Sequence, residues 1–127
     1  MTDFPATIAP LTLTTSVAAA EAYAALTQDF NPIHLDPTFA KGTAFGKPIA
    51  HGTMALNLLY AAVDVATAQA FYIADLNIRF SAPTYVGQVI TGILRQQDGA
   101  LYALEVRTDD NRVVLTGTAR LANRVAP

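Results

Sequence analysis

The chain has 127 residues, of which 52% are hydrophobic and only 14% are charged. The length predicts one domain over residues 1–127, and the apolar excess over an ordinary soluble monomer predicts that part of the surface is buried against another copy, in a homodimer or larger homo-oligomer. A formal charge of −2 and the absence of cysteine exclude a basic surface for nucleic acid, disulfides and a thiol nucleophile.

The first predicted elements are a short strand and a helix. Residues 11–14 alternate between leucine and threonine, which is typical of a strand. Thr15 or Ser16 can then cap a helix, whose apolar positions recur at spacings of three and four and which we expect to end near Gln28. The Asn31-Pro32 pair that follows disfavours further helical backbone.

A short helix and a long helix are predicted next. Asp36-Pro37 has the N-cap and first-turn residues of a helix, and Gly42 stands where a glycine would end it after about one turn. Residues 43–50 are predicted to form an ordered loop. From Gly52 to about Ala70 the sequence has almost no helix breaker, and apolar residues lie on every side. We therefore predict a buried helix about 28 Å long.

The rest of the chain changes to strand periodicity. Hairpin turns are indicated by Asp98-Gly99 and Asp110-Asn111. Strands are predicted over residues 74–81, 86–96, 101–108 and 113–122. These segments form an antiparallel meander, while the long helix needs a concave apolar face to bury it. The sequence therefore predicts an α+β fold in which a strongly curved antiparallel sheet wraps around one central helix.

No membrane insertion is predicted. The longest uncharged run, residues 48–63, includes His51, Gly52 and Asn57 and falls short of the roughly 20 strongly apolar residues of a membrane span. The N-terminal residues lack the basic start and the apolar stretch of a signal peptide. We expect a cytoplasmic protein.

Two short segments hold the groups that can carry chemistry. Asp29 and His34 flank the Asn31-Pro32 turn, and His51 and Gly52 stand at the start of the long helix. Both histidines of the chain therefore lie in this region. The proline fixes one backbone angle and the asparagine can bond to nearby backbone, so the turn can hold a carboxylate and an imidazole close together.

Three segments carry a resemblance to a known family. The first begins at Tyr23 and Leu26, continues as Asp29-x-Asn31-Pro32-Ile33-His34-x-Asp36 and reaches Ala40. The others are Phe45-Gly46-Lys47-Pro48-Ile49-Ala50-His51-Gly52 and Phe80-Ser81-Ala82-Pro83-Thr84-Tyr85-Val86-Gly87. In these segments the chain resembles the MaoC-like dehydratases, the (R)-specific enoyl-CoA hydratase branch of the hotdog-fold proteins. The resemblance implies a single hotdog fold. It also implies that Asp29 and His34 are the catalytic pair and that the amide of Gly52 contacts the thioester oxygen.

The implied reaction adds water to a trans-2-enoyl thioester, or removes it in the reverse direction. It requires a base that takes a proton from water, an acid that protonates the α-carbon, and a donor that stabilises negative charge on the carbonyl oxygen. Asp29 and His34 can divide the first two tasks in either assignment. Gly52, whose amide lies at a helix N-terminus, suits the third task. No nucleophilic serine or cysteine is needed.

Other residues are expected to bind the substrate, an acyl thioester of CoA or of an acyl carrier protein. We expect His51 to bond backbone near the start of the long helix. Thr53 stands where methionine is common in the family, and Tyr60 stands where one type of the family has serine. Both differences are expected to affect the preference for acyl chains. The predicted substrate-binding residues are Asn31, His51, Thr53, Tyr60 and Phe45.

Neither a metal nor a redox cofactor is expected. A calcium loop starting at Asp29 fails because Pro32 breaks the pattern, His34 takes the glycine position and Ala40 stands at position twelve, where glutamate is needed. Zinc bound through His34, His51 and a carboxylate would have no recognised ligand spacing.

Two other functions stay open. A hotdog thioesterase would use a carboxylate-activated water on the carbonyl carbon and would release a free thiol. A non-catalytic acyl-thioester binding subunit would share the fold. The intact set of Asp29, His34 and Gly52 argues against this inactive role.

Overall fold

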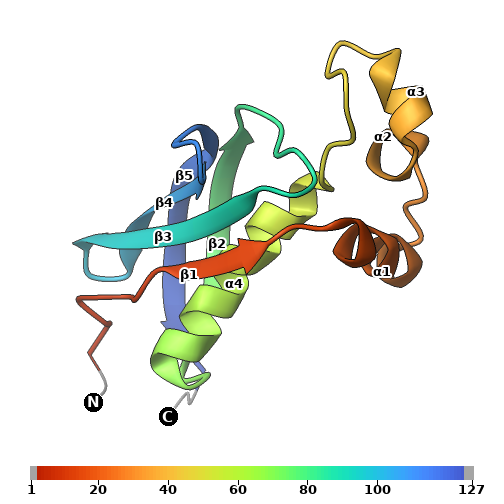
Figure 1. Ribbon diagram of the computed structural model, residues 1–127. Coiled ribbons are helices and arrows are strands. Elements are labelled where there is room, and N and C mark those ends of the chain that lie inside the picture. The colour runs from red at the N-terminus through yellow and green to blue at the C-terminus, as the bar shows by residue number, and fades with distance from the viewer. Residues whose placement is uncertain (1–2, 125–127) are drawn as a thin grey trace.

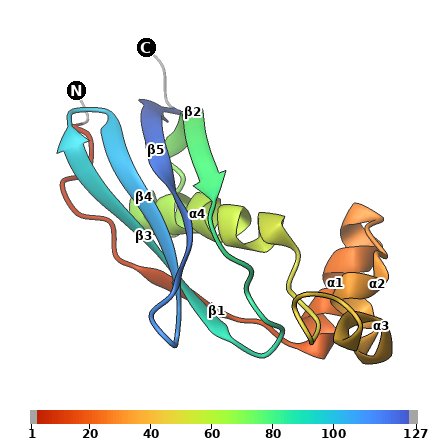
Figure 2. The same cartoon turned by 90° about the horizontal axis from the view of Figure 1, so that it is seen from above.

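The computed structural model describes residues 3–124, which form an antiparallel sheet curved around a central helix (Figures 1 and 2). The five strands have the order β1-β3-β4-β5-β2, and helix α4 contacts all of them. This confirms the predicted α+β architecture. The elements are β1 (Leu11–Thr14), α1 (Val17–Thr27), α2 (Pro32–Leu35), α3 (Pro37–Lys41), α4 (Gly52–Thr67), β2 (Phe71–Phe80), β3 (Val89–Asp98), β4 (Leu101–Thr108) and β5 (Val113–Asn123).

The prediction of one domain over residues 1–127 stays a prediction, and residues 1–2 and 125–127 lie outside the described part. Within residues 3–124, no helix combines the length and the apolar character that crossing a bilayer requires.

Tight turns join β3 to β4 and β4 to β5. Gly99 and Asn111 adopt left-handed φ angles of 55° and 64°, which glycine and asparagine tolerate best. These turns confirm the two hairpins predicted from the sequence. They bring β3, β4 and β5 side by side in antiparallel register.

The strand boundaries differ from the predicted ones at two starts. Strand β2 begins three residues earlier than predicted, because its pairing with β5 continues to Phe71 opposite Asn123. Strand β3 begins three residues later, at Val89. The residues before it form a turn that Thr15 fixes, since the Thr15 hydroxyl accepts from the Gly87 amide at 2.9 Å. Strand β4 has the predicted bounds and β5 is one residue longer.

Helix α4 is shorter and less enclosed than the sequence predicts. It ends at Thr67, and the next residues, Ala68 and Gln69, have left-handed φ angles of 50° and 66°. One side of the helix is also open, with Tyr60 39% and Val65 71% exposed. The prediction of a helix buried on every side is therefore wrong for a single chain, because the curved sheet covers only one side of α4.

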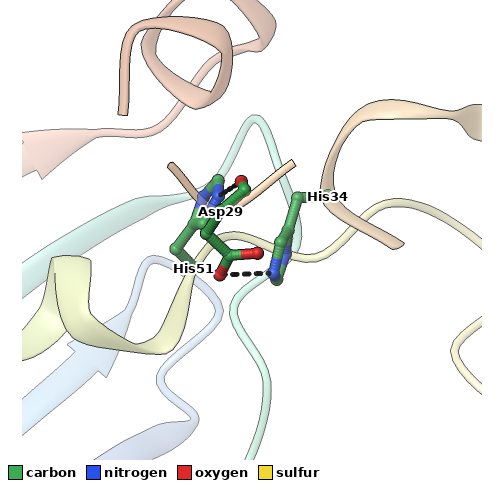
Figure 3. Close-up of side chains that lie close together, drawn as sticks. All are labelled: Asp29, His34 and His51. Atoms are coloured by element: carbon green, nitrogen blue, oxygen red, sulfur yellow. Dashed lines mark hydrogen bonds and ion pairs between the residues drawn. The ribbon is translucent and has the colours of Figure 1, made fainter. Parts of the chain in front are cut away.

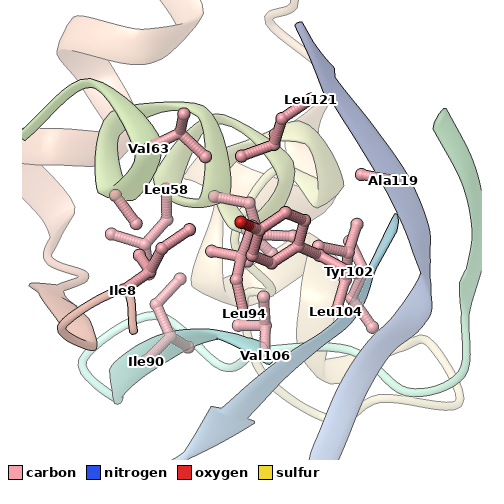
Figure 4. Close-up of a cluster of buried hydrophobic side chains, with 14 of the residues drawn as sticks. Ile8, Leu58, Val63, Ile90, Leu94, Tyr102, Leu104, Val106, Ala119 and Leu121 are labelled. Carbon is pink, nitrogen blue, oxygen red and sulfur yellow. The ribbon is translucent and has the colours of Figure 1, made fainter. Parts of the chain in front are cut away.

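The hydrophobic core fills the space between α4 and the sheet (Figure 4). Leu58 and Val63 of α4 meet Ile90, Leu104 and Tyr102 from the strands, and all five side chains are at most 5% exposed. Burial of each large apolar side chain stabilises the fold by about 1.5–3 kcal/mol. The core therefore holds α4, and with it the start of the helix at Gly52, in a fixed position.

The N-terminal helices lie together beside the N-terminal end of α4 (Figures 1 and 2). Of the two predicted caps for α1, Ser16 is the one used, since its hydroxyl accepts from the Ala19 amide at 3.0 Å. Asn31 and Asp36 cap α2 and α3, and a proline follows each cap. The sequence predicts α3 correctly, whereas the single helical turn α2 was expected only as a turn.

Gly117→Ala is expected to destabilise the fold by about 3 kcal/mol, because the backbone of the paired strand β2 lies very close to Gly117 of β5. A Cβ on Gly117 would lie 2.1 Å from the backbone oxygen of Asn77 and 2.8 Å from the Cα of Ile78. Urea unfolding measures the change in stability. If Gly117→Ala is recovered only as insoluble protein, this also supports the prediction. The control is Gly42→Ala, whose new Cβ meets only the Phe39 oxygen at 3.5 Å. Equal midpoints for the two variants would contradict the prediction.

Candidate active site

Asp29 and His34 approach each other beside the start of α4 (Figure 3). The distance between Asp29 Oδ2 and His34 Nε2 is 3.7 Å. The Asp29 side chain is 49% exposed and the His34 side chain 11% exposed. A water molecule can reach the carboxylate, while the imidazole lies at the edge of the interior.

Local hydrogen bonds hold the turn that carries this pair. The Asn31 side chain accepts from the Ile33 amide at 3.1 Å, and the Asn31 amide donates to Asp29 Oδ1 at 3.2 Å. The His34 amide donates to the Asn31 carbonyl at 3.0 Å. Asn31 therefore links the backbone of the carboxylate to that of the imidazole, as its position between them in the sequence suggests.

The loop before α4 determines how the His34 ring is oriented. His34 Nδ1 lies 2.7 Å from the carbonyl oxygen of Ile49, and because a carbonyl only accepts hydrogen bonds, Nδ1 carries the hydrogen. This leaves Nε2 as the nitrogen that faces Asp29. The role of Ile49 was not predicted, since a backbone acceptor leaves no signal in the sequence.

His51 contacts both members of the Asp29–His34 pair. Its Nε2 lies 3.0 Å from the backbone oxygen of Asp29, and its ring stacks on that of His34 with centroids 3.9 Å apart. The residue is only 3% exposed. His51 thus bonds the backbone, as expected, but the partner is the Asp29 turn and not the helix start.

Gly52 and His34 both line a cavity of about 260 Å³ between α4 and the sheet. Gly52 is the first residue of α4, so its amide has no acceptor within the helix. The wall is mainly apolar and includes side chains from the loop after β2. The lining residues are His34, Phe45, Ile49, Ala50, His51, Gly52, Met54, Ala55, Phe80, Ala82, Pro83, Thr84, Ile90 and Val114.

The predicted substrate-binding residues divide into two groups. Phe45 and His51 line the cavity. Asn31 instead caps α2, and the Thr53 hydroxyl bonds the hydroxyl of Tyr23. Tyr60 lies on the open side of α4, away from the cavity wall. Its apolar surroundings in the sequence do not reveal which side of the helix the sheet covers.

Several cavity residues were not assigned to the site from the sequence. Ile90 and Val114 are the second residues of β3 and β5, two strands that begin at the cavity, and Thr84 follows β2. Val114 and Ile90 are at most 2% exposed. The alternation of inward and outward side chains along a strand predicts only that Ile90 and Val114 face the interior. It does not distinguish a cavity residue from any other core residue.

Asp29, His34 and His51 also lie close enough together to suggest a metal ion. One ligand atom from each lies within 4.8 Å of the others. The two rings, however, stack with an angle of only 27° between their planes. Their lone pairs lie in two separate, nearly parallel planes, an arrangement that does not favour convergence on one ion as a tetrahedral zinc site requires. The absence of a metal stays a prediction.

Dialysis against EDTA is expected to leave the hydratase activity that the resemblance implies unchanged within assay error. The reason is that the stacked histidines do not offer converging ligands. The measurement compares turnover before and after chelation, with zinc and magnesium added back in separate samples. A loss on chelation that one metal restores would contradict the prediction.

The fold and this arrangement define a protein of the hotdog class, with a carboxylate and an imidazole beside the N-terminus of its central helix. The family described as MaoC like domain matches residues 5–117. The chain therefore belongs to the MaoC-like family.

Named relatives are hydratases and dehydratases. The chain is 33% identical over 106 residues to the (R)-specific enoyl-CoA hydratase of Aeromonas caviae. The aligned residues are 77% of this chain and 78% of that protein. A solved structure of an (R)-hydratase from A. caviae has a TM-score of 0.77 at 30% identity and covers 91% and 92% of the two chains. The mitochondrial 3-hydroxyacyl-[acyl-carrier-protein] dehydratase of Arabidopsis thaliana is 25% identical over 95 residues, which are 75% of this chain and 52% of that protein.

Proposed function

We propose that the protein is an (R)-specific enoyl-thioester hydratase, which in the reverse direction dehydrates 3-hydroxyacyl thioesters. The observation that carries the proposal is the 3.7 Å approach of the Asp29 carboxylate to His34. His34 lines a cavity together with Gly52, the first residue of α4, whereas Asp29 is not part of the cavity wall. The names of the similar hydratase and dehydratase support the same class of reaction.

In the proposed hydration, water adds across the conjugated double bond. One group of the pair removes a proton from water as the water oxygen bonds to the β-carbon, and the double-bond electrons move toward the carbonyl oxygen. The other group then donates a proton to the α-carbon, and the thioester carbonyl re-forms. A proton passing between the two groups restores the pair, so the product carries all the atoms of the enoyl thioester and of water.

The His34 geometry supports Nε2 as the nitrogen that exchanges protons, because Nδ1 is held by the Ile49 carbonyl. A separation of 3.7 Å between Nε2 and the Asp29 carboxylate lets one water lie within hydrogen-bonding distance of both. We treat the two groups as one coupled pair, in which acid and base roles are shared.

Gly52 is proposed as the donor to the thioester oxygen. The amides of the first helical turn have no intrahelical acceptors and lie at the positive end of the helix dipole. Helix α4 has 16 residues, so its aligned peptide dipoles add up to a partial positive charge at the N-terminal end.

The proposed substrate is an acyl thioester of CoA or of an acyl carrier protein, in the cytoplasm. Met54, Ile90 and Val114 give the cavity an apolar interior that suits an acyl chain. Asn31, Thr53 and Tyr60 lie outside the cavity wall and stay proposed contacts. The addition of water needs neither a metal nor a redox cofactor, and we propose none.

The proposal is tested with purified protein and crotonyl-CoA, by following the loss of the conjugated absorbance. Chiral analysis of the product should give the (R)-3-hydroxy thioester. Unchanged absorbance at high protein concentration, with longer acyl chains as well, would refute the proposal. Release of a free thiol, measured with a thiol reagent, would indicate the thioesterase alternative.

We also propose that two copies form a homodimer. Strand β2 is an edge of the sheet, and exposed apolar side chains lie on it and on α4, namely Tyr60, Val65, Tyr72 and Phe80. Joining two sheets at this edge would satisfy backbone groups and cover the apolar surface. Light scattering after size-exclusion chromatography should give the mass of two chains, and the mass of one chain would contradict the proposal.

A further inference from the structure

His51 is a buried polar side chain to which the proposed chemistry gives no task. It is only 3% exposed, and its Nδ1 has no hydrogen-bond partner among the described residues. Buried polar atoms without partners are uncommon in proteins. A leucine or phenylalanine would fill the same space without leaving a nitrogen unpaired, so the imidazole needs another explanation.

Two contacts of His51 reach the proposed catalytic pair. Its Nε2 lies 3.0 Å from the carbonyl oxygen of Asp29, and since that oxygen only accepts, Nε2 carries the hydrogen. Its ring lies against the ring of His34, with centroids 3.9 Å apart (Figure 3). One side chain thus contacts the backbone of the carboxylate and the face of the imidazole.

Tyr23 holds His51 from the side of α1. The two rings lie 5.0 Å apart between centroids. The Tyr23 hydroxyl bonds Thr53 and also accepts from Asn57 Nδ2 at 2.8 Å, so Tyr23 is fixed to the first two turns of α4. Through His51, helix α1, the start of α4 and the turn with Asp29 and His34 are therefore packed into one unit.

We infer that His51 is a positioning residue that sets the distance between the Asp29 carboxylate and His34 Nε2. The hydrogen bond fixes the backbone of Asp29, and the stacked ring limits the rotation of His34 about its side-chain bonds. His51 does not exchange a proton with the substrate. The inference rests on the proposed hydratase function and adds to it a residue that acts through the catalytic pair.

The two contacts can be separated by substitution. His51→Gln keeps an amide donor near the position of Nε2 and removes the ring, whereas His51→Phe keeps a ring and removes the donor. His51→Ala removes both. We expect kcat for crotonyl-CoA hydration to fall by roughly tenfold in each of the first two variants and by roughly 100-fold in the third, with KM nearly unchanged.

NMR gives a readout that does not depend on turnover. The chain has two histidines, so each His51 variant retains a single imidazole, that of His34. In the unsubstituted protein, the nitrogen signals of the His34 ring are expected to report a single tautomer with hydrogen on Nδ1. In His51→Ala we expect a mixture of tautomers or a broadened His34 signal. Thermal unfolding identifies any variant that fails to fold, in which case His51→Gln carries the test.

Unchanged kcat together with an unchanged His34 signal in folded His51→Ala would overturn the inference. An increase in KM at constant kcat would also overturn it, because it would make His51 a substrate contact. If the unsubstituted protein shows no hydratase activity, the proposed function fails. The His34 signal would then still show whether His51 positions that ring.

Discussion

Asp29→Asn is expected to lower the turnover of crotonyl-CoA by about 100-fold or more while leaving Tm nearly unchanged. The amide cannot take up a proton from water, yet it has the shape of the carboxylate and can still accept from the Asn31 amide, which now lies 3.2 Å from Asp29 Oδ1. His34→Ala should cause a loss of similar size, because it removes the nitrogen that faces the carboxylate at 3.7 Å. Steady-state kinetics and thermal unfolding measure both effects.

Asp36→Asn is a matched control for the loss of a carboxylate. Asp36 lies two residues beyond His34, where Oδ1 accepts from the amides of Thr38 and Phe39 at 3.0 and 3.2 Å. Asparagine caps helices about as well as aspartate, so this variant should keep its activity and Tm. If Asp29→Asn instead lowers Tm strongly while the folded fraction stays active, Asp29 is a structural residue and the proposed function loses its main support.

The parts of the site that could be predicted from the sequence have local causes. Asn31-Pro32 forms a cap and first turn within a few residues, so Asp29 and His34 are brought together by the geometry of one short segment. The start of α4 at Gly52 could be predicted in the same way, from the apolar residues that follow it. Neither prediction needed knowledge of contacts distant in the sequence.

The parts that could not be predicted depend on contacts across the fold. The Ile49 carbonyl that orients His34 is a backbone group, and every residue has one. The contact of Tyr23 with Thr53 and Asn57 joins α1 to α4, which are separated in the chain by α2, α3 and the loop before α4. Tyr60 shows a related limit, because an apolar sequence on all sides of a helix does not reveal which side the sheet leaves open.

Gly52→Pro is expected to lower kcat/KM by about 100- to 1,000-fold, because proline has no amide hydrogen to donate to the thioester oxygen. The backbone should accept the change. Position 52 is the first residue of α4, where proline is favoured. His51 before it has φ −58° and ψ 131°, in the extended region that a residue preceding proline prefers.

Gly52→Ala separates the loss of the donor from the added bulk. It keeps the amide hydrogen, and its Cβ would lie 3.7 Å from Phe80 Cε1, an ordinary contact distance. We therefore expect the alanine variant to keep most of the activity, and the proline variant to fold but to show the loss of kcat/KM given above. Equal activity of both variants would exclude the Gly52 amide as the donor. Equal loss in both would point to the space beside Phe80, because the hydrogen bond would then be present in one variant and absent in the other without any difference in rate.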